Sequence, residues 1–430
     1  MTRTRPILVL RHCYWCTAGQ RAGLECSGGR CGRGMTFFTM MRAWASSRTM
    51  MGGVMVGVLV LLLFIKLLVA GRLPPSLPAV VADYEDHFAI DVVMGVEGGG
   101  WRSATCTPHT STPPFPVRLP KFTATPSDKN VFFLETTCAS ALNAKMACAL
   151  ESVAIHHPDH QVHLALTSSH VSGTDAIIHT LTTYSNIHIS TLDVDDALEG
   201  SGRLSKWLRG MEWARSEWAG INLSDALRLG VVCSVGGTYL DMDMWIVAPL
   251  PNTESWIGRE RWDQLSNGAF KIPKDHWICD EAIRELTEHF QGNVWGHNGP
   301  GVFQRVVRKA CNMQNISDVH QCKDLVMVAP STFYPLHWKR WEELFAPSGS
   351  NSWRWPPDTI GIHLWNKFSS GAPLHPGDGS IVDVASQQNC PKVYDTVRQI
   401  RKLRDHLQRR KMRKVSSGQG RDVQEDRRDV

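Results

Sequence analysis

Hydrophobic and polar positions divide the chain into segments with different patterns. Residues 50–70 form an apolar run broken only by Lys66, which can extend its amine to the interface. Since roughly 20 apolar residues cross a bilayer, this run predicts a transmembrane helix. Residues 71–127 have no sustained periodicity and are punctuated by Pro, Thr and Ser, which predicts a proline-stiffened stem. Residues 128–397 alternate strand and helix patterns, as an α/β domain does. A basic tail follows at 398–430 and is expected to be a helix that frays into disorder.

Four patterns open the α/β domain. Val131–Leu134 is an apolar run typical of a buried strand, Gln161–Leu166 and Ile187–Ile189 predict a second and a third strand, and Ala141–Ile155 has helical spacing. Ligands of open α/β sheets bind beyond the carboxyl ends of the strands. The polar residues that follow the first two strands are therefore expected near a nucleotide: Glu135, Thr136, Thr167 and Ser168. The alternative is that they only cap loops.

The stretch 222–237 predicts a helix that ends in a tight turn. Ser224 is placed to cap this helix, and Asp225 would then lie in the first turn, where the helix dipole favours a carboxylate. Asp225 and Arg228 are three residues apart, so they share one helix face. Gly236 and Gly237 end the helix because glycine adopts the left-handed conformation of helix caps.

Residues 238–247 alternate like a strand, which places Tyr239, Asp241 and Asp243 on one face. Two close carboxylates repel each other unless a positive charge neutralises them. Mg²⁺ or Mn²⁺ suits such oxygen ligands and can in turn hold a diphosphate. The alternative is an ordinary solvated strand end.

The order S-D-x-x-R, G-G-x-Y and D-x-D within residues 224–243 resembles the signature of a known family. This is the lactosylceramide 4-α-galactosyltransferase and α-1,4-N-acetylglucosaminyltransferase family of retaining glycosyltransferases, which have the GT-A fold. Further matches follow in family order between residues 130 and 395: Phe132–Thr136, Asn267–Phe270, Trp295–Pro300, Phe333–Pro335 and His363–Lys367. The resemblance implies a Rossmann-like, nucleotide-sugar-binding α/β domain at 128–397 behind a single transmembrane helix.

The resemblance also implies roles for individual residues. Asp225 and Arg228 would grip the donor sugar, and Tyr239 would lie against the nucleotide. Asp243, helped by Asp241 and His363, would hold Mn²⁺ or Mg²⁺, and imidazole is an acceptable ligand beside carboxylates. The other residues expected to bind substrate are Gly236, Gly237, Glu135, Thr136, Trp295, His297, Asn298, Trp365 and Asn366. The alternatives are that His297 has no role and that most of the tryptophans belong to the core or the rim.

Charge is distributed unevenly along the chain. Residues 1–49 carry eight Arg and one Glu, and residues 398–430 carry twelve Lys or Arg and five acids. Each end is therefore +7, and the remainder of the chain, out of +5 in total, is −9. An acidic folded part argues against nucleic-acid binding. The eight Arg before the apolar run favour a cytosolic N-terminus and a lumenal catalytic domain, the type II arrangement of a Golgi enzyme.

Two alternatives concern the N-terminal segment. The apolar run could be a cleaved signal peptide, although no cleavage site stands out. A start at one of several later methionines would leave the residues before it untranslated: Met35, Met40, Met41 or Met50. Cys13 and Cys16 suggest zinc, but the spacing of the neighbouring cysteines fits no common zinc site.

Eight cysteines follow the apolar run, and an even number in a lumen predicts disulfides. They are Cys106, Cys138, Cys148, Cys233, Cys279, Cys311, Cys322 and Cys390. Cys311 and Cys322 are the expected pair, whereas Cys233, inside the predicted helix, is expected to be a buried thiol. Of two glycosylation sequons, Asn315 lies in polar surroundings and is a plausible acceptor. Asn222 abuts the predicted helix and is expected to be unmodified.

These observations predict a Golgi glycosyltransferase that moves a hexose, galactose in α1,4 linkage, from a UDP-sugar to a glycolipid such as lactosylceramide, with retention. The alternative donors are N-acetylgalactosamine and N-acetylglucosamine, on glycolipid or glycoprotein. The protein could also form homo-oligomers, or hetero-oligomers with other Golgi glycosyltransferases. A different class of alternative is an inactive Golgi protein that keeps only the fold. A metal-dependent phosphohydrolase would need more His and Asp clusters than the chain shows.

Overall fold

The structure is a computed structural model that describes residues 115–416. The chain divides into two compact units, residues 1–74 and 75–430, and every described residue belongs to the second unit. The predictions for residues 1–49, for the apolar run and for most of the stem fall outside the described residues. None of the helices described is long and apolar enough to cross a membrane.

Strands and helices alternate through the described residues, as the sequence pattern predicts. The strands are β1 (Pro116–Arg118), β2 (Asn130–Glu135), β3 (Gln161–Leu166), β4 (His170–Ser172), β5 (Ile187–Thr191), β6 (Gly237–Leu240), β7 (Met244–Ile246), β8 (Ser255–Arg261), β9 (Gln264–Ile272), β10 (Gln321–Cys322), β11 (Leu325–Met327) and β12 (Gly361–His363).

The α-helices are α4 (Ala144–His156), α5 (Ala176–Leu181), α6 (Val194–Glu199), α7 (Gly202–Gly210), α8 (Ala219–Val235), α9 (Trp277–Glu288), α10 (Pro300–Ala310), α11 (Pro330–Phe333), α12 (Asn366–Ser369), α13 (Ile381–Asn389) and α14 (Pro391–Ser416). Three short 3-10 helices are η1 (Trp213–Arg215), η2 (Trp338–Leu344) and η3 (Gly349–Asn351).

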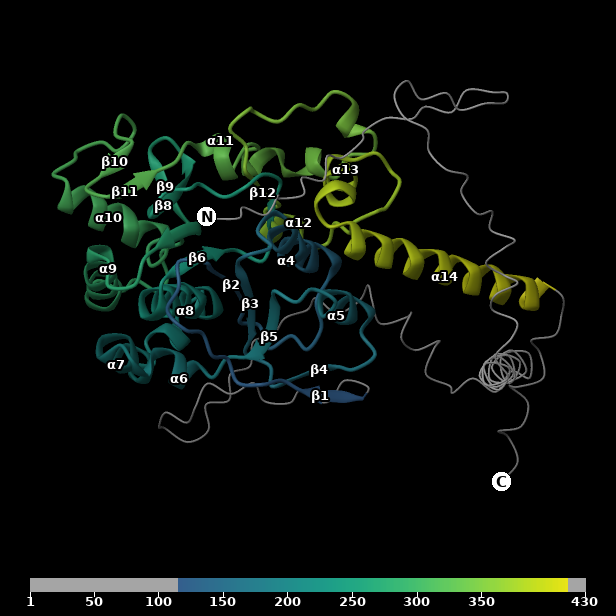
Figure 1. Ribbon diagram of the computed structural model, residues 1–430, viewed down its shortest axis with the longest axis horizontal. Coiled ribbons are helices and arrows are strands. Elements are labelled where there is room, and N and C mark those ends of the chain that lie inside the picture. The colour runs from purple at the N-terminus through teal and green to yellow at the C-terminus, as the bar shows by residue number, and fades with distance from the viewer. Residues whose placement is uncertain (1–114, 417–430) are drawn as a thin grey trace, which may run out of the picture. The chain divides into compact units, whose positions relative to one another are not determined.

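The main sheet has eight strands in the order β10-β11-β8-β9-β6-β2-β3-β5 (Figure 1). β6, β2, β3 and β5 run parallel, and β9 joins β6 antiparallel. The carboxyl ends of β2, β3 and β6 therefore meet at one edge of the sheet, where ligands of open α/β sheets bind. Two small sheets, β1-β4 and β12-β7, lie outside the main sheet.

Side chains of β2 alternate between two hydrophobic cores, one on each face of the main sheet. Val131 and Phe133 belong to the core formed with α4, α5, α13 and α14. Phe132 and Leu134 belong to the core formed with α6 to α10. Because the strand period is two, this fully buried strand serves both faces, as expected of a central parallel strand covered by helices on both sides.

The predicted first strands, the first helix and the glycine turn are confirmed. β2, β3 and β5 begin within one residue of the expected positions, and α4 begins three residues later than expected. Asn143 explains that start, because its side-chain oxygen accepts the Met146 N–H at 2.9 Å and caps the helix. α8 ends at Gly236 (φ 75°), and Gly237 has φ 124°.

Two details of the stretch 222–247 are wrong in the sequence-based prediction. α8 begins at Ala219, so Ser224 lies inside the helix and its hydroxyl accepts a hydrogen bond from Arg228 instead of capping. The predicted strand 238–247 is two strands, β6 and β7, separated by a turn in which the Met244 N–H donates to the Asp241 carbonyl at 2.9 Å. β7 then leaves the main sheet and pairs with β12.

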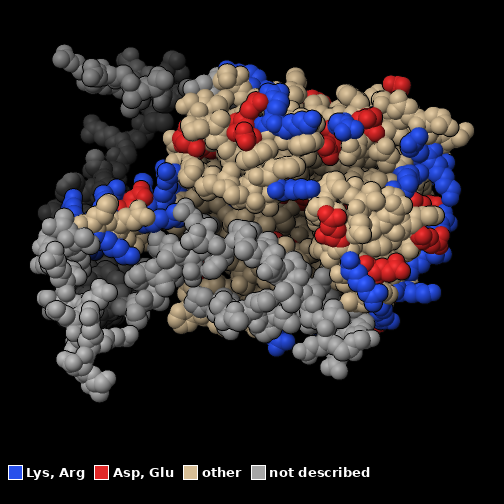
Figure 2. Space-filling model, turned by 180° about the vertical axis from the view of Figure 1, so that it is seen from behind, with Lys and Arg blue, Asp and Glu red and all other residues tan. Residues whose placement is uncertain are grey.

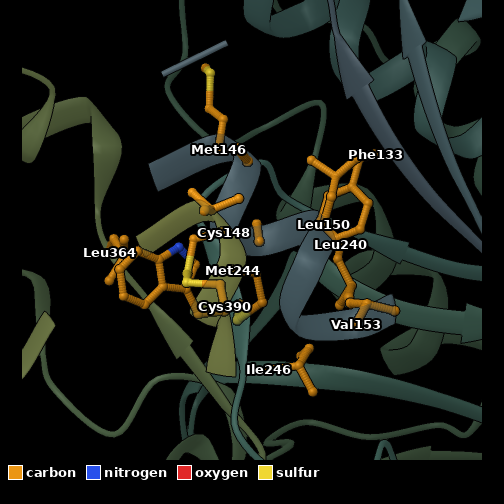
Figure 3. Packing of buried hydrophobic residues seen from close by; sticks show 14 of the residues in the cluster. Phe133, Met146, Cys148, Leu150, Val153, Leu240, Met244, Ile246, Leu364 and Cys390 are labelled. Atoms are coloured by element: carbon orange, nitrogen blue, oxygen red, sulfur yellow. A yellow bond between two sulfur atoms is a disulfide. The ribbon is translucent and has the colours of Figure 1, made fainter. Parts of the chain in front are cut away.

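The cysteine predictions are confirmed for one pair and wrong for Cys233. Cys311 and Cys322 form a disulfide. Cys233 is bonded to Cys279, which links α8 to α9, so it is not a free thiol. The helices bring the two sulfurs together over 46 residues, a contact that local spacing does not reveal. A third disulfide joins Cys148 of α4 to Cys390 before α14 (Figure 3).

The basic tail begins as a long helix. α14 packs through Val393, Tyr394 and Val397, which are buried, and it continues to Ser416. Its later side chains are mostly exposed, and Lys and Arg side chains are visible along it in Figure 2. The helix expected at the start of the tail is therefore present up to Ser416, and the disorder expected after it stays a prediction, because 417–430 lies outside the described residues.

Candidate active site

The turn between β6 and β7 and the end of β12 bring two carboxylates and an imidazole together. The antiparallel register places His363 opposite Met244, and the Leu364 N–H donates to the Asp243 carbonyl at 2.9 Å. His363 Nε2 lies 3.3 Å from Asp243 Oδ1 and 3.7 Å from Asp241 Oδ2. One ligand atom from each of the three residues lies within 4.8 Å of the others. The sequence placed Asp241 and Asp243 together by one continuous strand, which the structure replaces with two, and it placed His363 beside them by the family resemblance.

Backbone N–H groups orient the members of this cluster. Asp243 Oδ2 accepts the Asn366 N–H at 2.6 Å, and His363 Nδ1 accepts the Trp365 N–H at 3.3 Å. Trp365 has φ 57°, which lets the chain turn sharply here. His363 therefore presents Nε2 to the carboxylates. Burial would lower the pKa of His363, but the charges of Asp243 and Asp241 outweigh it and raise that pKa.

Arg228 binds Asp241 rather than standing free to meet a ligand. Its Nη1 donates to Asp241 Oδ1 at 2.8 Å and to the Asn267 carbonyl at 3.0 Å. Nη2 and Nε donate to the hydroxyl and the carbonyl of Ser224 at 2.9 and 3.3 Å. The Tyr239 hydroxyl donates to the same Asp241 oxygen at 2.9 Å, and the guanidinium lies 4.5 Å from the centre of the Tyr239 ring.

The charges of this network keep Asp241 ionised. Burial opposes ionisation, but Arg228 and His363 outweigh it and lower the pKa of Asp241 to about 2. For Arg228 itself, burial disfavours the charged form, yet Tyr239, Asp241 and Asp225 raise its pKa above the usual value. Arg228 thus orients a predicted metal ligand and neutralises part of its charge.

Asp225 lies beside this network in a buried setting. Its Oδ1 accepts a hydrogen bond from the Asn267 side chain at 2.7 Å and lies 3.6 Å from Arg228 Nη2. Burial raises the pKa of Asp225, although Arg228 and Asn267 oppose that shift. A Cβ at Gly299 would lie 2.6 Å from Asp225 Oδ2, so only glycine allows the chain to pass this close to the carboxylate. An oxygen with these neighbours can accept a hydrogen bond from a ligand hydroxyl.

Glu135 and Thr136 follow β2 at the same edge of the sheet, next to β6. Glu135 Oε1 accepts hydrogen bonds from the backbone and the hydroxyl of Thr137, the former at 2.6 Å, and burial raises the pKa of Glu135. Thr167 follows β3, where its hydroxyl meets the Cys138 N–H at 3.2 Å. These residues stand at the edge predicted for a nucleotide, but their hydrogen bonds are to one another and not to the Asp241 cluster.

His297 and Asn298 are turned to other partners. His297 Nε2 meets the His289 carbonyl at 2.9 Å. Asn298, 2% exposed, accepts the Gln291 N–H at 3.0 Å and donates to Asn222 Oδ1 and the Gln291 carbonyl, each at 2.9 Å. Both ends of its amide are therefore engaged in anchoring the loop to α8. The same contacts bury Asn222, whose amide also donates to Ser216 at 2.9 Å.

The two tryptophans singled out by the sequence have different surroundings. Trp365 is buried, and its ring centre lies 4.4 Å from that of His363 while its Nε1 donates to the Leu336 carbonyl at 2.9 Å. It thus supports the imidazole from behind. Trp295 is 51% exposed and contacts Trp218 and Lys367.

Several residues of the site were not predicted to have a role. Asn267 holds Asp225, and the Tyr334 hydroxyl bonds Ser266 at 2.5 Å while its ring contacts His363. Asn267 and Tyr334 stand in two of the matched motifs, which was the available signal. Glu260, at the end of β8, is a half-buried carboxylate whose charge raises the pKa of His363; burial raises the pKa of Glu260 itself. No motif marked Glu260.

Two family regions match the chain on either side of β9. Residues 143–263 match the glycosyltransferase sugar-binding region containing the DXD motif, and residues 271–397 match the α1,4-glycosyltransferase conserved region. The first region supplies Asp241 and Asp243, and the second supplies His363. The fold and the site therefore define a nucleotide-sugar glycosyltransferase.

Curated relatives show the same family. The human lactosylceramide 4-alpha-galactosyltransferase is 26% identical over 295 residues, which are 67% of this chain and 82% of that protein. The human alpha-1,4-N-acetylglucosaminyltransferase is 25% identical over 278 residues, 62% of this chain and 80% of that protein. The chain is thus similar to both enzymes, and its residues 271–397 match the α1,4-glycosyltransferase conserved region.

Solved structures similar to the chain include a galactosyltransferase LgtC in complex with donor and acceptor sugar analogs. Its TM-score is 0.30 at 13% identity, and the match covers 62% of this chain and 95% of that one. Mouse xyloside xylosyltransferase 1 has a TM-score of 0.33 at 12% identity and covers 54% and 96%.

Proposed function

We propose that this chain is a Golgi-resident GT-A enzyme that transfers galactose from UDP-galactose, in α1,4 linkage and with retention, to a glycolipid such as lactosylceramide. The observation that carries the proposal is the Asp241, Asp243 and His363 cluster with Asp225 buried beside it. An acidic, imidazole-containing cluster at the carboxyl edge of a parallel sheet suits a metal-bound nucleotide diphosphate.

The cluster has the donor set that Mn²⁺ or Mg²⁺ prefers, two carboxylates and one imidazole with converging atoms. The other group of this kind in the described residues is His157, Asp159 and His160, where Asp159 pairs with Lys129 and His157 Nε2 accepts the Leu250 N–H. A cation held by Asp241, Asp243 and His363 would supply charge neutralisation for the departing diphosphate.

The protein's own residues orient the reactants. Asp225 offers a carboxylate oxygen to donor-sugar hydroxyls, and Arg228 fixes Asp241 so that its second oxygen faces His363. In retaining transfer by the front face, the bond from the anomeric carbon to the phosphate oxygen breaks as the bond to the acceptor oxygen forms on the same side. The acceptor proton passes to the leaving diphosphate. No side chain has to act as a nucleophile in this route.

A donor panel tests the activity. The full chain, expressed in cells that lack the endogenous activity, is assayed in microsomes with lactosylceramide and UDP-galactose, UDP-N-acetylgalactosamine or UDP-N-acetylglucosamine. We expect galactose transfer, with an α1,4 product identified by linkage analysis. Preference for an N-acetylhexosamine donor would replace the galactose assignment, a result that the similarity to the N-acetylglucosaminyltransferase makes worth testing. If the protein transfers or releases sugar from none of the three donors, the result would support the alternative of an inactive protein that keeps only the fold.

The Golgi and type II proposal rests on the apolar run 50–70 and the eight Arg before it. A C-terminal tag should be protected from protease in intact microsomes and digested once detergent is added. Digestion without detergent would place the domain in the cytosol and refute the topology.

A further inference from the structure

Three segments meet in a cluster of aromatic rings around one lysine. Trp218 precedes α8, Trp295 lies in the loop before α10, and Lys367 and Phe368 belong to α12. The rings of Trp218 and Trp295 have their centres 4.9 Å apart at 78°. Lys367 Nζ lies 3.1 Å from the centre of the Trp295 ring, 5.0 Å from that of Trp218 and 5.9 Å from that of Phe368. We call these four residues the aromatic cluster.

The chain connects the aromatic cluster to the candidate active site at two points. Asn366, next to Lys367, donates its N–H to Asp243 at 2.6 Å. The loop that begins with Trp295 reaches Asp225 at Gly299, where only glycine fits against the carboxylate. The cluster is therefore joined to a predicted metal ligand one residue along the chain from Lys367, and to the predicted donor-sugar carboxylate four residues along the chain from Trp295.

The cluster also presents unusual surface chemistry. Trp295 is 51% exposed and Phe368 is 41% exposed, although large aromatic side chains bury most of their area in ordinary packing. Phe368 is held flat against Trp338, with ring centres 5.3 Å apart and planes 14° apart. Among the residues that the structure describes, Lys367 contacts rings and no carboxylate. Its ammonium has three donors and no protein oxygen within this part of the chain to accept them.

We propose that the aromatic cluster is the acceptor-sugar subsite, in which the apolar C–H face of a terminal hexopyranose stacks on Trp295 and Phe368. Lys367 donates hydrogen bonds to hydroxyls of the same sugar. The proposal rests on the proposed function, because it places the acceptor beside the donor site. Rings with an adjacent cation suit a pyranose, which has apolar faces and polar edges. In the proposed function the donor sugar binds elsewhere, at the buried Asp225, which Asn267 holds.

Kinetics with a soluble acceptor separate this subsite from lipid contacts. Full-chain Trp295→Ala and Phe368→Ala are assayed with UDP-galactose and methyl β-lactoside. We expect the KM for the lactoside to rise at least about fivefold, as loss of an aromatic anchor does at binding sites. The KM for UDP-galactose should change less than twofold. Trp295→Tyr, which keeps a ring, should recover most of the loss.

Trp262→Ala is the matched control, because Trp262 is also 50% exposed and carries a cation–π contact, to Arg259, but it lies in the turn between β8 and β9. It should leave both KM values unchanged. Melting temperatures verify that all variants are folded. We expect them to be, because the substituted side chains are exposed.

Three outcomes would overturn the subsite. In the first, the KM for the lactoside stays within twofold of wild type in both alanine variants. In the second, the KM for UDP-galactose rises as much as the KM for the lactoside. In the third, the variants lose transfer to bilayer-embedded glycolipid but keep transfer to the soluble lactoside. Saturation-transfer NMR with methyl β-galactoside measures binding of the sugar to the subsite without turnover. Trp295→Ala should abolish the saturation-transfer signal. An enzyme that transfers to no galactoside yet gives this signal would contradict the proposed function and retain the subsite. Absence of the signal in wild type would refute the subsite.

Discussion

Asp243 is the residue on which the metal assignment depends most directly. Asp243→Asn nearly preserves shape but removes the charge that, with Asp241 and His363, would bind the cation. We expect kcat/KM to fall at least about hundredfold, which is about 2.7 kcal/mol of transition-state stabilisation. Mn²⁺ binding, followed by electron paramagnetic resonance, should weaken in parallel. Asp263→Asn is the control, because the Asp263 side chain is exposed and its ion pair among the described residues is with Arg261. Full activity of the variant, or of wild type in excess chelator, would refute the metal role.

Arg228 is the cation of a buried network, so its loss should affect folding as well as catalysis. Arg228→Leu removes the guanidinium that Asp225 and Asp241 share and leaves Asp241 with the imidazole of His363 as its ion-pair partner, and breaking a buried pair in this way costs about 3–5 kcal/mol. Urea unfolding would measure the loss. Arg203→Leu breaks an exposed pair with Glu288 and should cost less than about 1 kcal/mol. Similar small losses in the two variants would show that Arg228 is not needed to neutralise the buried acids.

The sequence predicted the members of the site better than their partners. Asp225, Arg228, Asp241, Asp243 and His363 do converge, because motif spacing reports which residues a site needs. Spacing does not report what each side chain binds. Arg228 was expected to grip the donor sugar; the structure adds its hydrogen bond to Asp241, and the donor contact stays a prediction. Asn298 was expected to meet a sugar, which also stays a prediction; the structure adds the hydrogen bonds of its amide to Gln291 and Asn222.

Helix α12 positions Asp243, and one lysine of α4 holds the end of that helix. Lys145 is buried, and its amine donates to the carbonyls of Ser369 and Ala372, the latter at 2.9 Å. Asn366, at the start of α12, donates to Asp243. Lys145→Met keeps the aliphatic stem and removes both hydrogen bonds. We expect kcat/KM to fall about tenfold, as supporting residues of metal sites show, with about 1–3 kcal/mol of stability lost.

Lys392→Met is the control for this element, because Lys392 is an exposed lysine whose amine donates to Thr183 on the surface. It should change neither rate nor stability. If Lys145→Met loses stability but keeps its kcat/KM, the lysine braces the core without positioning α12.

The sequence predicted the boundaries of those strands and helices that local residue patterns mark. It missed boundaries that depend on pairing with segments distant in the sequence. The apolar run Val131–Leu134 located β2, which is buried along its whole length, and local strand patterns located β3 and β5. The break between β6 and β7 is invisible to alternation, which continues through the turn. What ends β6 is the pairing of β7 with β12, a strand more than a hundred residues later. The start of α8 was missed because no side chain caps it.

The two family regions of the whole molecule are held together covalently as well as by packing. Cys148 lies in the first region and Cys390 in the second, 242 residues apart. Their disulfide belongs to the same hydrophobic core cluster as Met244 and Leu364, the sequence neighbours of Asp243 and His363 (Figure 3). Sequence could not supply this pairing, because eight cysteines allow many connectivities. A bond that closes so long a loop restricts the unfolded chain strongly.

Removal of this bond should therefore lower stability more than it lowers the intrinsic rate. A Cys148→Ala/Cys390→Ala variant is expected to lose about 3–5 kcal/mol on unfolding. Below its melting temperature it should keep kcat/KM within about threefold, because the β7 and β12 pairing that positions His363 does not require the bond. Denaturant unfolding and initial rates at low temperature measure the two effects. Cys311→Ala/Cys322→Ala, which opens a loop of 11 residues remote from His363 in sequence, is the comparison and should lose less stability. An equal loss in both variants would show that loop length does not govern the effect, and a rate loss beyond tenfold in the first would make the disulfide part of the site's geometry.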